Sequence, residues 1–547
     1  MDDQGAASPA AKSRFAAPLS AALVVGAVGV SAGMFGSGCL LTNINADECE
    51  SSAACVVAFG LGSSCADGYC TEAGSCSTGH DCRRLYNGGA CVEGRCVNQL
   101  PADPIGACTI HEPEDLASRP LAGEGSPLIV GGMFRMGDTA DPPMSEGGRL
   151  AILEINDVSR LNDGREIAMV ICDNGGANNE LLDDARRQQI HTVTDYLAGT
   201  LGVPFIAGPV TSSDSLTTLS HILSNQYPTV MISPSATSPQ LTVEPDKLDP
   251  ANDAYGLFWR TAPSDEAQGA ILAEHVVGKY PAPEDPSMTH VAVVYIDDAY
   301  GVGLANVFSE TWTGAGHTTN LFPFTETTDW DQLGAMVAQA APDAVLMIAI
   351  DAARAIFFAT AMAQQPAISG QTLYLTDGSK DETGLLDPNL PPAVQAILYN
   401  QTVGTAPAAP SGTDFDFFAA AMQAEFQLDP RAFAFVANTY DAAYVGAFGA
   451  VFASQDGSNW DGRNVAAGLA RLHHGPGSPL VTIGKNDWAT AKAGLTTGDK
   501  AIEITGISGG LDFDAALGEA PAPIEVWRPS ADCGGAPCFA EIAIINL

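Results

Sequence analysis

Two clusters of hydroxyl side chains stand at the ends of neighbouring apolar runs. The first cluster, Thr211-Ser212-Ser213-Asp214, follows the apolar run 204–210 and opens an amphipathic helix. The second cluster, Ser233-Pro234-Ser235-Ala236-Thr237, follows the apolar run 229–232. The free N–H groups and the dipole of a helix start favour an anion such as a carboxylate. Anion binding is therefore the chemistry that these residues can offer.

The two clusters together carry more information than either one alone. Ser, Thr and Asp before a helix are common caps, so a single cluster indicates no more than a helix start. Residues 204–232, however, read as strand, helix and strand, and such a unit builds a parallel sheet. Ligands of open α/β sheets bind at the carboxyl ends of the strands. The sequence therefore predicts that both clusters lie at one binding rim.

Strands and helices alternate along most of the chain after residue 127. The predicted elements of a first series are 128–134, 149–155, 166–172, 181–201 and the unit at 204–232. A second series begins near Arg260, and Ser264-Asp265 can cap its first helix. Its later elements are 290–295, 300–312, 343–350, 352–364 and 371–375, ending at Thr376-Asp377-Gly378. Two such series predict an α/β protein with two lobes, each a mostly parallel sheet flanked by helices, and a ligand cleft between them.

Composition restricts the partners of the chain. Its 547 residues allow several domains, and 24 Lys and Arg stand against 64 Asp and Glu, which gives a net charge of −40. This charge argues against nucleic acid and anionic membrane surfaces as partners. It indicates a solvated acidic surface and does not by itself imply a cationic ligand. The 13 cysteines indicate an oxidising compartment.

Residues 1–38 are typical of an export leader. Lys12 and Arg14 form a basic start, and an uncharged run follows from Phe15 to Met34. The run ends before Cys39 and resembles a bacterial lipoprotein signal, in which that cysteine is lipidated. The run is also long enough, at about 20 residues, to remain as an uncleaved anchor. Both alternatives place the rest of the chain outside the cytoplasm, in the periplasm or at the cell surface, and attach it to the membrane.

A tandem cysteine repeat occupies residues 39–100. Each copy holds four cysteines and closes on Cys-x-x-Gly-x-Cys. The cysteines are Cys49, Cys55, Cys65 and Cys70 in the first copy, and Cys76, Cys82, Cys91 and Cys96 in the second. Such a segment has too few apolar residues for a core, so we expect disulfides to hold it, and three pairings per copy are possible. Zinc is the weaker alternative, because only His80 lies inside the repeat. The repeat is either a spacer or a contact module.

The remaining segments are predicted from composition. Residues 502–529 read as paired strands around Gly509-Gly510 and Phe513-Asp514, and Cys533 and Cys538 can close a small terminal loop. Cys108 and Cys172 then remain and are expected to form a disulfide with each other. The expected organisation is a leader at 1–38, the repeat at 39–100, a linker at 101–126, lobe 1 at 127–260, lobe 2 at 261–400, a return to lobe 1 at 401–500, and terminal strands at 501–547.

From about Leu128 to Pro529 the chain resembles the type I periplasmic binding proteins, specifically the branched-chain amino acid (Leu/Ile/Val) binding family of ABC transporters. Motifs in the family's order carry the resemblance. They lie at 206–213 (IAGPVTSS), 232–239 (ISPSATSP), 258–265 (FWRTAPSD), 295–304 (YIDDAYGVGL), 376–378 (TDG), 440–443 (YDAA) and 504–509 (ITGISG). The resemblance implies the two-lobed type I periplasmic-binding fold, with the cysteine repeat as an addition.

The resemblance also implies a ligand site. The family holds an amino acid's carboxylate on a serine, a threonine and backbone amides, which match Ser212, Ser235, Ala236 and Thr237, with Val210 and Thr211 alongside. Neutral donors at a helix start suit this role, because they need no buried cation nearby. The family's ammonium site matches Asp377 and Gly378, and Tyr300 matches a tyrosine that closes over the ligand. The loop from Arg135 to Pro143 is longer and more charged than the family's. This loop borders the side-chain pocket, so the resemblance does not identify the ligand.

The implied function is an extracytoplasmic solute-binding lipoprotein that binds an amino acid or similar small polar ligand, with an ABC permease as its partner. The alternative is a ligand-sensing receptor module of the same fold. No Gly-x-Ser-x-Gly, His-Glu-x-x-His or phosphate loop occurs, and the pair Asp297-Asp298 reads as a surface turn. We therefore expect no enzymatic activity, no catalytic residue, no cofactor and no metal.

Overall fold

The computed structural model describes residues 49–72, 74–176, 182–280, 284–408, 410–457, 460–473 and 477–546. The predicted leader and Cys39 lie outside these residues. Among the described helices, none combines the length and the apolar character that crossing a bilayer requires.

The first lobe is built on a six-stranded sheet with the order β10-β9-β8-β6-β7-β5. Five of its strands are parallel, and β5 runs antiparallel to β7. The bounds are β5 Ile110–Glu112, β6 Leu128–Phe134, β7 Ile167–Asp173, β8 Phe205–Ala207, β9 Val230–Ser233 and β10 Phe258–Arg260. The parallel strands read as unbroken apolar runs because helices cover both faces of the sheet. These helices are α3 Asp141–Val158, α4 Asp184–Thr194, α5 Ser212–Ser224, α6 Gln240–Val243, α13 Thr413–Phe426, α14 Val436–Ala453, α15 Gly462–Leu469 and α16 Trp488–Thr496.

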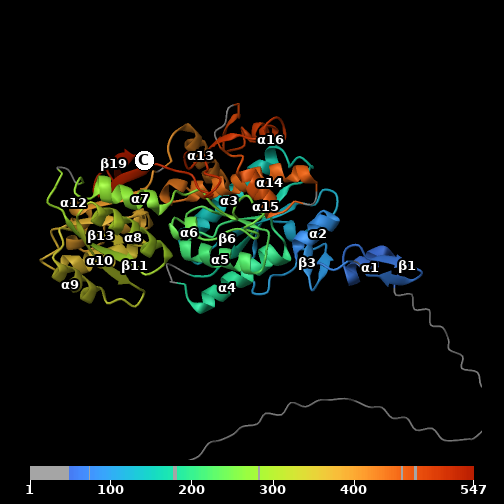
Figure 1. The fold of residues 1–547 in the computed structure, drawn as a ribbon, viewed down its shortest axis with the longest axis horizontal. Helices are drawn as coiled ribbons and strands as arrows, with labels where there is room; N and C mark the ends of the chain where they lie inside the picture. Colours follow the sequence, from blue (N-terminus) through green and yellow to red (C-terminus); the bar gives the residue numbers. More distant parts are fainter. Residues whose placement is uncertain are drawn as a thin grey trace, which may run out of the picture. The chain divides into compact units, whose positions relative to one another are not determined.

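The second lobe is built on a seven-stranded sheet with the order β12-β11-β13-β14-β15-β18-β19. Its first five strands are parallel, and β18 and β19 close it as an antiparallel hairpin. The bounds are β11 His290–Ile296, β12 Thr318–Phe324, β13 Ala344–Ile348, β14 Thr372–Leu375, β15 Thr402–Pro407, β18 Ile524–Ser530 and β19 Cys538–Ile545. Its helices are α7 Asp265–Ile271, α8 Ala299–Gly314, α9 Trp330–Ala340, α10 Ala352–Ala363, α11 Glu382–Leu385 and α12 Pro392–Gln401 (Figure 1).

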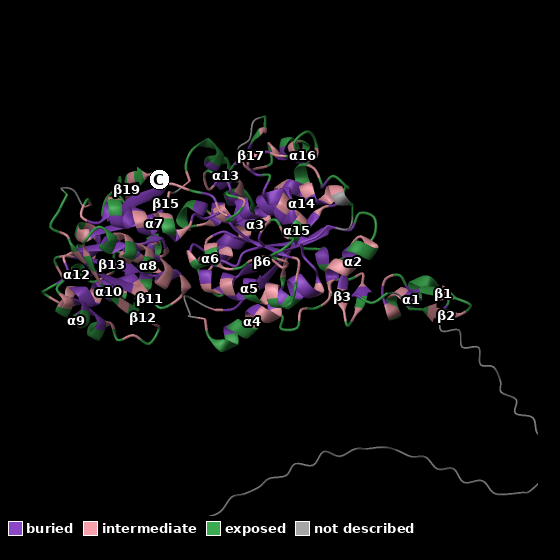
Figure 2. Cartoon of the chain, in the orientation of Figure 1, coloured by how far each residue is buried: buried purple, intermediate pink, exposed green. Residues whose placement is uncertain are grey.

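Each sheet has its own hydrophobic core. In Figure 2 the central strands of both sheets are buried, whereas the edge strands β12 and β19 and the outward turns of α4 and α9 are partly exposed. The chain passes between the two cores three times: between β10 and α7, between β15 and α13, and on the way from β17 (Glu503–Thr505) to β18. The predicted two-lobed α/β architecture is therefore confirmed.

Three expected boundaries differ from the structure. The segment expected to be a linker, 101–126, contributes β5 to the first sheet and buries Leu116 and Leu121. β15 lies in the second sheet, although residues 401–500 were expected to return to lobe 1. The two strands within 502–529, which were expected to pair with each other, do not: β17 pairs with β16 (Leu480–Thr482), while β18 joins β15. These partners are distant in sequence, and local patterns carry no information on them.

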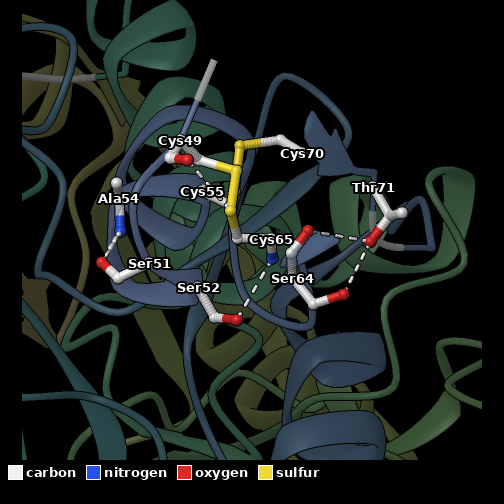
Figure 3. Close-up of a disulfide and its surroundings, with 9 residues drawn as sticks. All are labelled: Cys49, Ser51, Ser52, Ala54, Cys55, Ser64, Cys65, Cys70 and Thr71. Carbon is white, nitrogen blue, oxygen red and sulfur yellow. Dashed lines mark hydrogen bonds between the residues drawn. A yellow bond between two sulfur atoms is a disulfide. The ribbon is translucent and has the colours of Figure 1, made fainter. Parts of the chain in front are cut away.

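The cysteine repeat is a disulfide-bonded module with one pairing rule. In each copy the first cysteine bonds the third and the second bonds the fourth: Cys49–Cys65, Cys55–Cys70, Cys76–Cys91 and Cys82–Cys96. Each copy folds as a short helix and a hairpin, with α1 Ser52–Phe59, β1 Ser64–Ala66 and β2 Tyr69–Thr71, then α2 Gly79–Tyr86, β3 Ala90–Val92 and β4 Arg95–Val97. Figure 3 shows the first copy, where Ser52 Oγ accepts the Cys65 N–H at 3.1 Å. The bonds Cys108–Cys172 and Cys533–Cys538 are also present.

The second copy is docked on lobe 1 through a buried arginine. Arg83 is 5% exposed, its Nη1 donates to the Gly202 carbonyl at 2.5 Å, and its guanidinium lies 5.0 Å from the centre of the Trp460 ring. Gly79 lies against the Leu201 carbonyl, where a Cβ would collide. A buried guanidinium that keeps a carbonyl partner and a ring face stabilises such a contact. The second copy is therefore part of the folded body of lobe 1.

We predict that Arg83→Ala weakens this docking. The variant loses a charged hydrogen bond and a cation–π contact, which together are worth about 2–4 kcal/mol. Hydrogen exchange, measured by mass spectrometry without reductant, should become faster in α2 and around Gly202. The control is Arg84→Ala, because the Arg84 side chain is 50% exposed. Equal exchange in both variants would show that Arg83 does not hold the module.

Candidate functional site

The first hydroxyl cluster caps α5 and faces the second cluster. Thr211 Oγ1 accepts the Asp214 N–H at 3.3 Å, as a cap does. Ser212 is buried, and its Oγ accepts the Ser238 N–H at 3.1 Å. Val210 is buried beside it, and its carbonyl accepts Ser235 Oγ at 2.8 Å. The structure therefore brings the two clusters to one rim, as the strand–helix–strand pattern predicts.

The second cluster bonds to charged groups that sequence reasoning did not place there. Thr237 Oγ1 donates to Asp265 Oδ2 at 2.9 Å. Behind the cluster lies the fully buried Arg260, whose Nη1 donates to the carbonyls of Ala236 at 3.2 Å and Ser238 at 3.0 Å. The expectation of neutral donors with no buried cation nearby is therefore wrong for this chain. Glu519 pairs with Arg260 and balances its charge.

The lobe 2 part of the site is centred on Asp377, which follows β14. Its Oδ1 lies 2.8 Å from the Tyr300 hydroxyl and accepts Gln268 Nε2 at 3.0 Å. The same Tyr300 hydroxyl lies 2.8 Å from Thr376 Oγ1. Gly378 lies against the Ala349 carbonyl, where a Cβ would collide, so a side chain would displace the strand end. Tyr300 and Asp377 thus meet as the sequence predicts, with Gln268 as an added partner.

Direct hydrogen bonds join the two lobes at this place. Ser238 Oγ donates to the Ala299 carbonyl at 2.7 Å, and the Ala299 N–H donates to Ser213 Oγ at 3.3 Å. Ala299 is the first residue of α8, so the start of α8 lies against both hydroxyl clusters. Asp298, expected on a surface turn, is half-buried and caps α8 by accepting the Gly301 N–H at 2.8 Å. Burial raises the pKa of Asp298 to about 6.

Two carboxylates at the junction carry charge that is not balanced by a bonded cation. Asp265 is 0% exposed and Asp377 is 7% exposed. Burial, and next the charge of Asp377, raise the pKa of Asp265 well above its usual value. Burial also raises the pKa of Asp377, while hydrogen bonds from Tyr300 and Gln268 oppose this shift. Asp265 Oδ1 is buried and has no hydrogen-bond partner among the described residues. Such a pair can be satisfied by a cationic donor such as an ammonium group.

Asp265 is the residue that sequence reasoning missed. It was read only as part of a helix cap, and Ser264 does cap α7. The signal that could have found it is its position, because Asp265 directly follows the first passage from the first lobe to the second. A residue at such a passage meets both lobes, whatever its role in the helix.

A cavity of about 600 Å³ lies beside the junction, bounded by all three passages between the lobes. Of the nine predicted ligand-binding residues, Asp377 alone lines it; the hydroxyl groups of Ser212, Ser235 and Thr237 bond to protein groups instead. The described residues therefore place the acid at the cavity and the hydroxyl rim behind it. Half-buried rings and polar chain passages make up the rest of the lining, which suits a small organic ligand.

The charged loop after β6 is neutralised within lobe 1. Arg135 Nη2 lies 2.9 Å from Asp141 Oδ1 and 3.3 Å from Asp138 Oδ2, and all three residues are buried. Arg186 pairs with Asp214 in the same way, and Asn174 Nδ2 donates to Asp214 at 3.0 Å. The extra charge of this loop is thus used for its own packing.

Within the described residues, the groups of three or more potential metal ligands consist of repeat cysteines, Cys49, Cys55 and Cys70 in one copy and Cys76, Cys82 and Cys96 in the other. All six are in disulfides, so their sulfur atoms are not thiolates that could bind a metal.

Comparisons with known proteins agree with this geometry. A sequence relative, the Leu/Ile/Val-binding protein BraC3 of Rhizobium johnstonii, is 27% identical over 175 residues, which are 32% of this chain and 40% of that relative. The leucine-binding protein LivK of Thermotoga maritima has a TM-score of 0.53 at 17% identity, covering 77% of this chain and 99% of its own.

Two further solved structures share the fold. LivJ of Streptococcus pneumoniae, in complex with isoleucine, has a TM-score of 0.53 at 16% identity over 76% of this chain and 100% of its own. A solute-binding protein of Rhodopseudomonas palustris, in complex with p-hydroxybenzoic acid, has a TM-score of 0.56 at 14% identity over 77% of this chain and 97% of its own. These likenesses confirm the type I periplasmic-binding fold.

A family model for periplasmic binding proteins matches residues 136–493, which is more than half of the chain. This match covers the elements from α3 to α16, which lie in both lobes and include the hydroxyl rim and Asp377. The chain therefore belongs to the periplasmic binding protein family, whose members bind solutes.

Proposed function

We propose that the chain binds a small solute bearing an amine, an amino acid or a similar molecule, between its two lobes. The observation that carries this proposal is the buried acid pair, Asp265 at the first passage and Asp377 at the rim of lobe 2. A buried carboxylate without a counter-charge is costly, and an ammonium group removes that cost by bonding to both acids. The Tyr300 hydroxyl, 2.8 Å from Asp377 Oδ1, orients that carboxylate.

The solute's carboxylate, where it has one, would bind at the start of α5. The backbone N–H groups of this helix end, together with Ser212, Ser235 and Thr237, are the donors for it. For Thr237 to serve, its hydroxyl must turn from Asp265 to the solute. This exchange is favourable only when an ammonium group takes the place of the Thr237 donor at Asp265. The amine is therefore the primary determinant in this proposal, and the carboxylate is secondary.

Closure follows from the placement of the two halves of the site. The hydroxyl rim belongs to lobe 1 and Asp377 to lobe 2, so a solute that contacts both stabilises the closed arrangement. The bonds from Ser238 and Ser213 to Ala299 form across the same junction. We propose that the closed form delivers its solute to an ABC permease, and that a lipid on Cys39 keeps the protein at the membrane.

We predict that Asp377→Asn removes most of the affinity for amine-bearing solutes. Loss of a buried charge partner costs about 2–5 kcal/mol, which is roughly a 30-fold or larger rise in Kd. The solute is first found by a thermal-shift screen with the twenty amino acids and simple amines, because a bound solute raises the melting temperature. Calorimetry then compares the variant with Asp297→Asn, an exposed acid of lobe 2. An unchanged Kd in Asp377→Asn would reject the ammonium role.

We also predict that Asp265→Asn stabilises the solute-free protein near neutral pH. The folded pKa of Asp265 is raised above its usual value of 3.8, so its ionised form disfavours folding at high pH. This penalty disappears as the pH falls through the folded pKa toward 3.8, because the folded protein then binds a proton. The gain in unfolding free energy, about 1–3 kcal/mol near pH 8, should therefore shrink toward pH 4. Asn keeps an oxygen for the Thr237 hydroxyl.

Urea unfolding at several pH values measures this difference, and Asp297→Asn serves again as the control. A gain that is constant from pH 8 to pH 4 would show that Asp265 is not the titrating group. A loss of stability at every pH would show that its charge is balanced in the folded protein.

A further inference from the structure

The cavity beside Asp377 is larger than an amine contact requires. Its volume of about 600 Å³ lies within the range of roughly 300–1,000 Å³ that holds drug-sized ligands. Asp377 forms one part of its wall, and the cavity then extends along the passages between the lobes to the terminal hairpin β18–β19. An ammonium group at Asp377 therefore leaves most of this space for the rest of the solute.

Aromatic rings from both lobes face this space. Lobe 1 contributes Phe433 and Phe435 from the segment before α14, and lobe 2 contributes Trp527 and Phe539 from the hairpin. Phe433 and Phe435 are half-buried, and neither makes a ring–ring contact with another described residue. Trp527 and Phe539 meet edge to face with their centroids 4.9 Å apart. Trp527 itself is fully buried, so Phe433, Phe435 and Phe539 are the rings that a flat apolar group of a solute could contact.

The hairpin is fixed to the loop that carries Asp377. Lys380, three residues after Asp377, pairs with the buried Glu525 of β18. Its Nζ also lies 6.0 Å from the centre of the Phe539 ring on β19. The disulfide Cys533–Cys538 closes the turn of the same hairpin. The wall that Phe539 provides is therefore held in a set position relative to Asp377.

The charges along the wall do not favour a second anionic group on the solute. Both cations that line the cavity are already paired, Lys380 with Glu525 and Arg431 with Asp416 at 2.6 Å. Glu382 and Glu541 add negative charge to the lining. A carboxylate at the far end of a solute would thus meet acids and paired cations, whereas an uncharged ring would meet rings.

We propose that this cavity holds an aromatic arm, so that the solute is an amine with an aromatic group rather than a small aliphatic amino acid. This inference rests on the proposed function, because it takes the ammonium position at Asp377 and Asp265 as its starting point. Two sources supply the chemistry: a free aromatic amino acid or amine, and a short peptide whose amino terminus precedes an aromatic residue.

The test is calorimetry on the full chain with leucine, homophenylalanine and the dipeptide Leu-Phe in its C-terminally amidated form, which share an α-ammonium group; the amide removes the carboxylate from the far end of the peptide. We expect homophenylalanine or Leu-Phe to bind about 10- to 100-fold more tightly than leucine, because a buried ring removes apolar surface from water. Tighter binding of homophenylalanine identifies the free amine, and tighter binding of Leu-Phe identifies the peptide.

The gain in affinity of the aromatic solutes over leucine must depend on the residues of the cavity wall. Phe539→Ala should remove most of the gain, taken as the ratio of the two Kd values in the same variant, whereas Phe357→Ala, an exposed ring on α10, should leave this ratio unchanged. Ala434→Trp is the second variant: Ala434 is exposed at the rim of the cavity, so an indole there fills the space without disturbing a core. It should abolish the gain as well.

The outcomes separate the two proposals. If leucine binds through Asp377 and the aromatic solutes bind no more tightly, the aromatic arm is rejected and the amine site stands. If the gain survives in both Phe539→Ala and Ala434→Trp, the arm lies elsewhere and the inference is rejected. If none of the three solutes binds although another amine raises the melting temperature, the aromatic arm is rejected and the amine site stands. If no amine of the screen binds either, the proposed function fails, and this inference fails with it.

Discussion

Two buried carboxylates, Asp265 and Asp377, set the main physical constraint on this molecule. Like charges in a low-dielectric interior repel each other, and hydration cannot compensate for them there. Each acid is held by donors from a different element: Thr237 bonds Asp265, while Gln268 and Tyr300 bond Asp377. These neutral donors fix the positions of the acids but supply no positive charge. The two acids therefore lack a bonded positive charge, which a bound cation can supply.

Both acids lie where a relative movement of the two lobes changes their surroundings. Asp265 begins α7 directly after the first passage between the lobes, and Asp377 follows β14 at the rim of the second sheet. Both acids belong to elements of lobe 2, and Asp265 also bonds Thr237 of lobe 1. When the lobes are together, the hydroxyl rim therefore covers the two carboxylates. A solute with an ammonium group lowers the cost of covering them, so it favours the closed arrangement.

Much of this arrangement could be predicted from the sequence, because parallel sheets leave local patterns. The apolar runs at 204–210 and 229–232 and the hydroxyl residues after them indicated the rim, and Tyr300 and Asp377, which the family resemblance assigned to one site, indeed meet. The order of the strands could not be read in full. β15 and β18 are neighbours in the second sheet, although more than a hundred residues separate them. Asp265 was missed for a related reason, because its partners Thr237 and Asp377 are distant from it in sequence.

The passages between the lobes connect the site to the rest of the chain. Asp441 on α14 holds the third passage: its carboxylate accepts the N–H groups of Ile507 at 2.9 Å and Ser508 at 2.8 Å, and burial raises its pKa to about 7. Ser508 lines the cavity beside Asp377, and the hairpin that follows this passage closes the cavity through Phe539. A movement of the lobes must therefore change the cavity and the surroundings of the acid pair together, since the same passages bound both. For this reason the size of a solute's arm and the position of its amine are not independent in this fold: an arm that holds the passages apart also separates Asp265 from Thr237 of lobe 1.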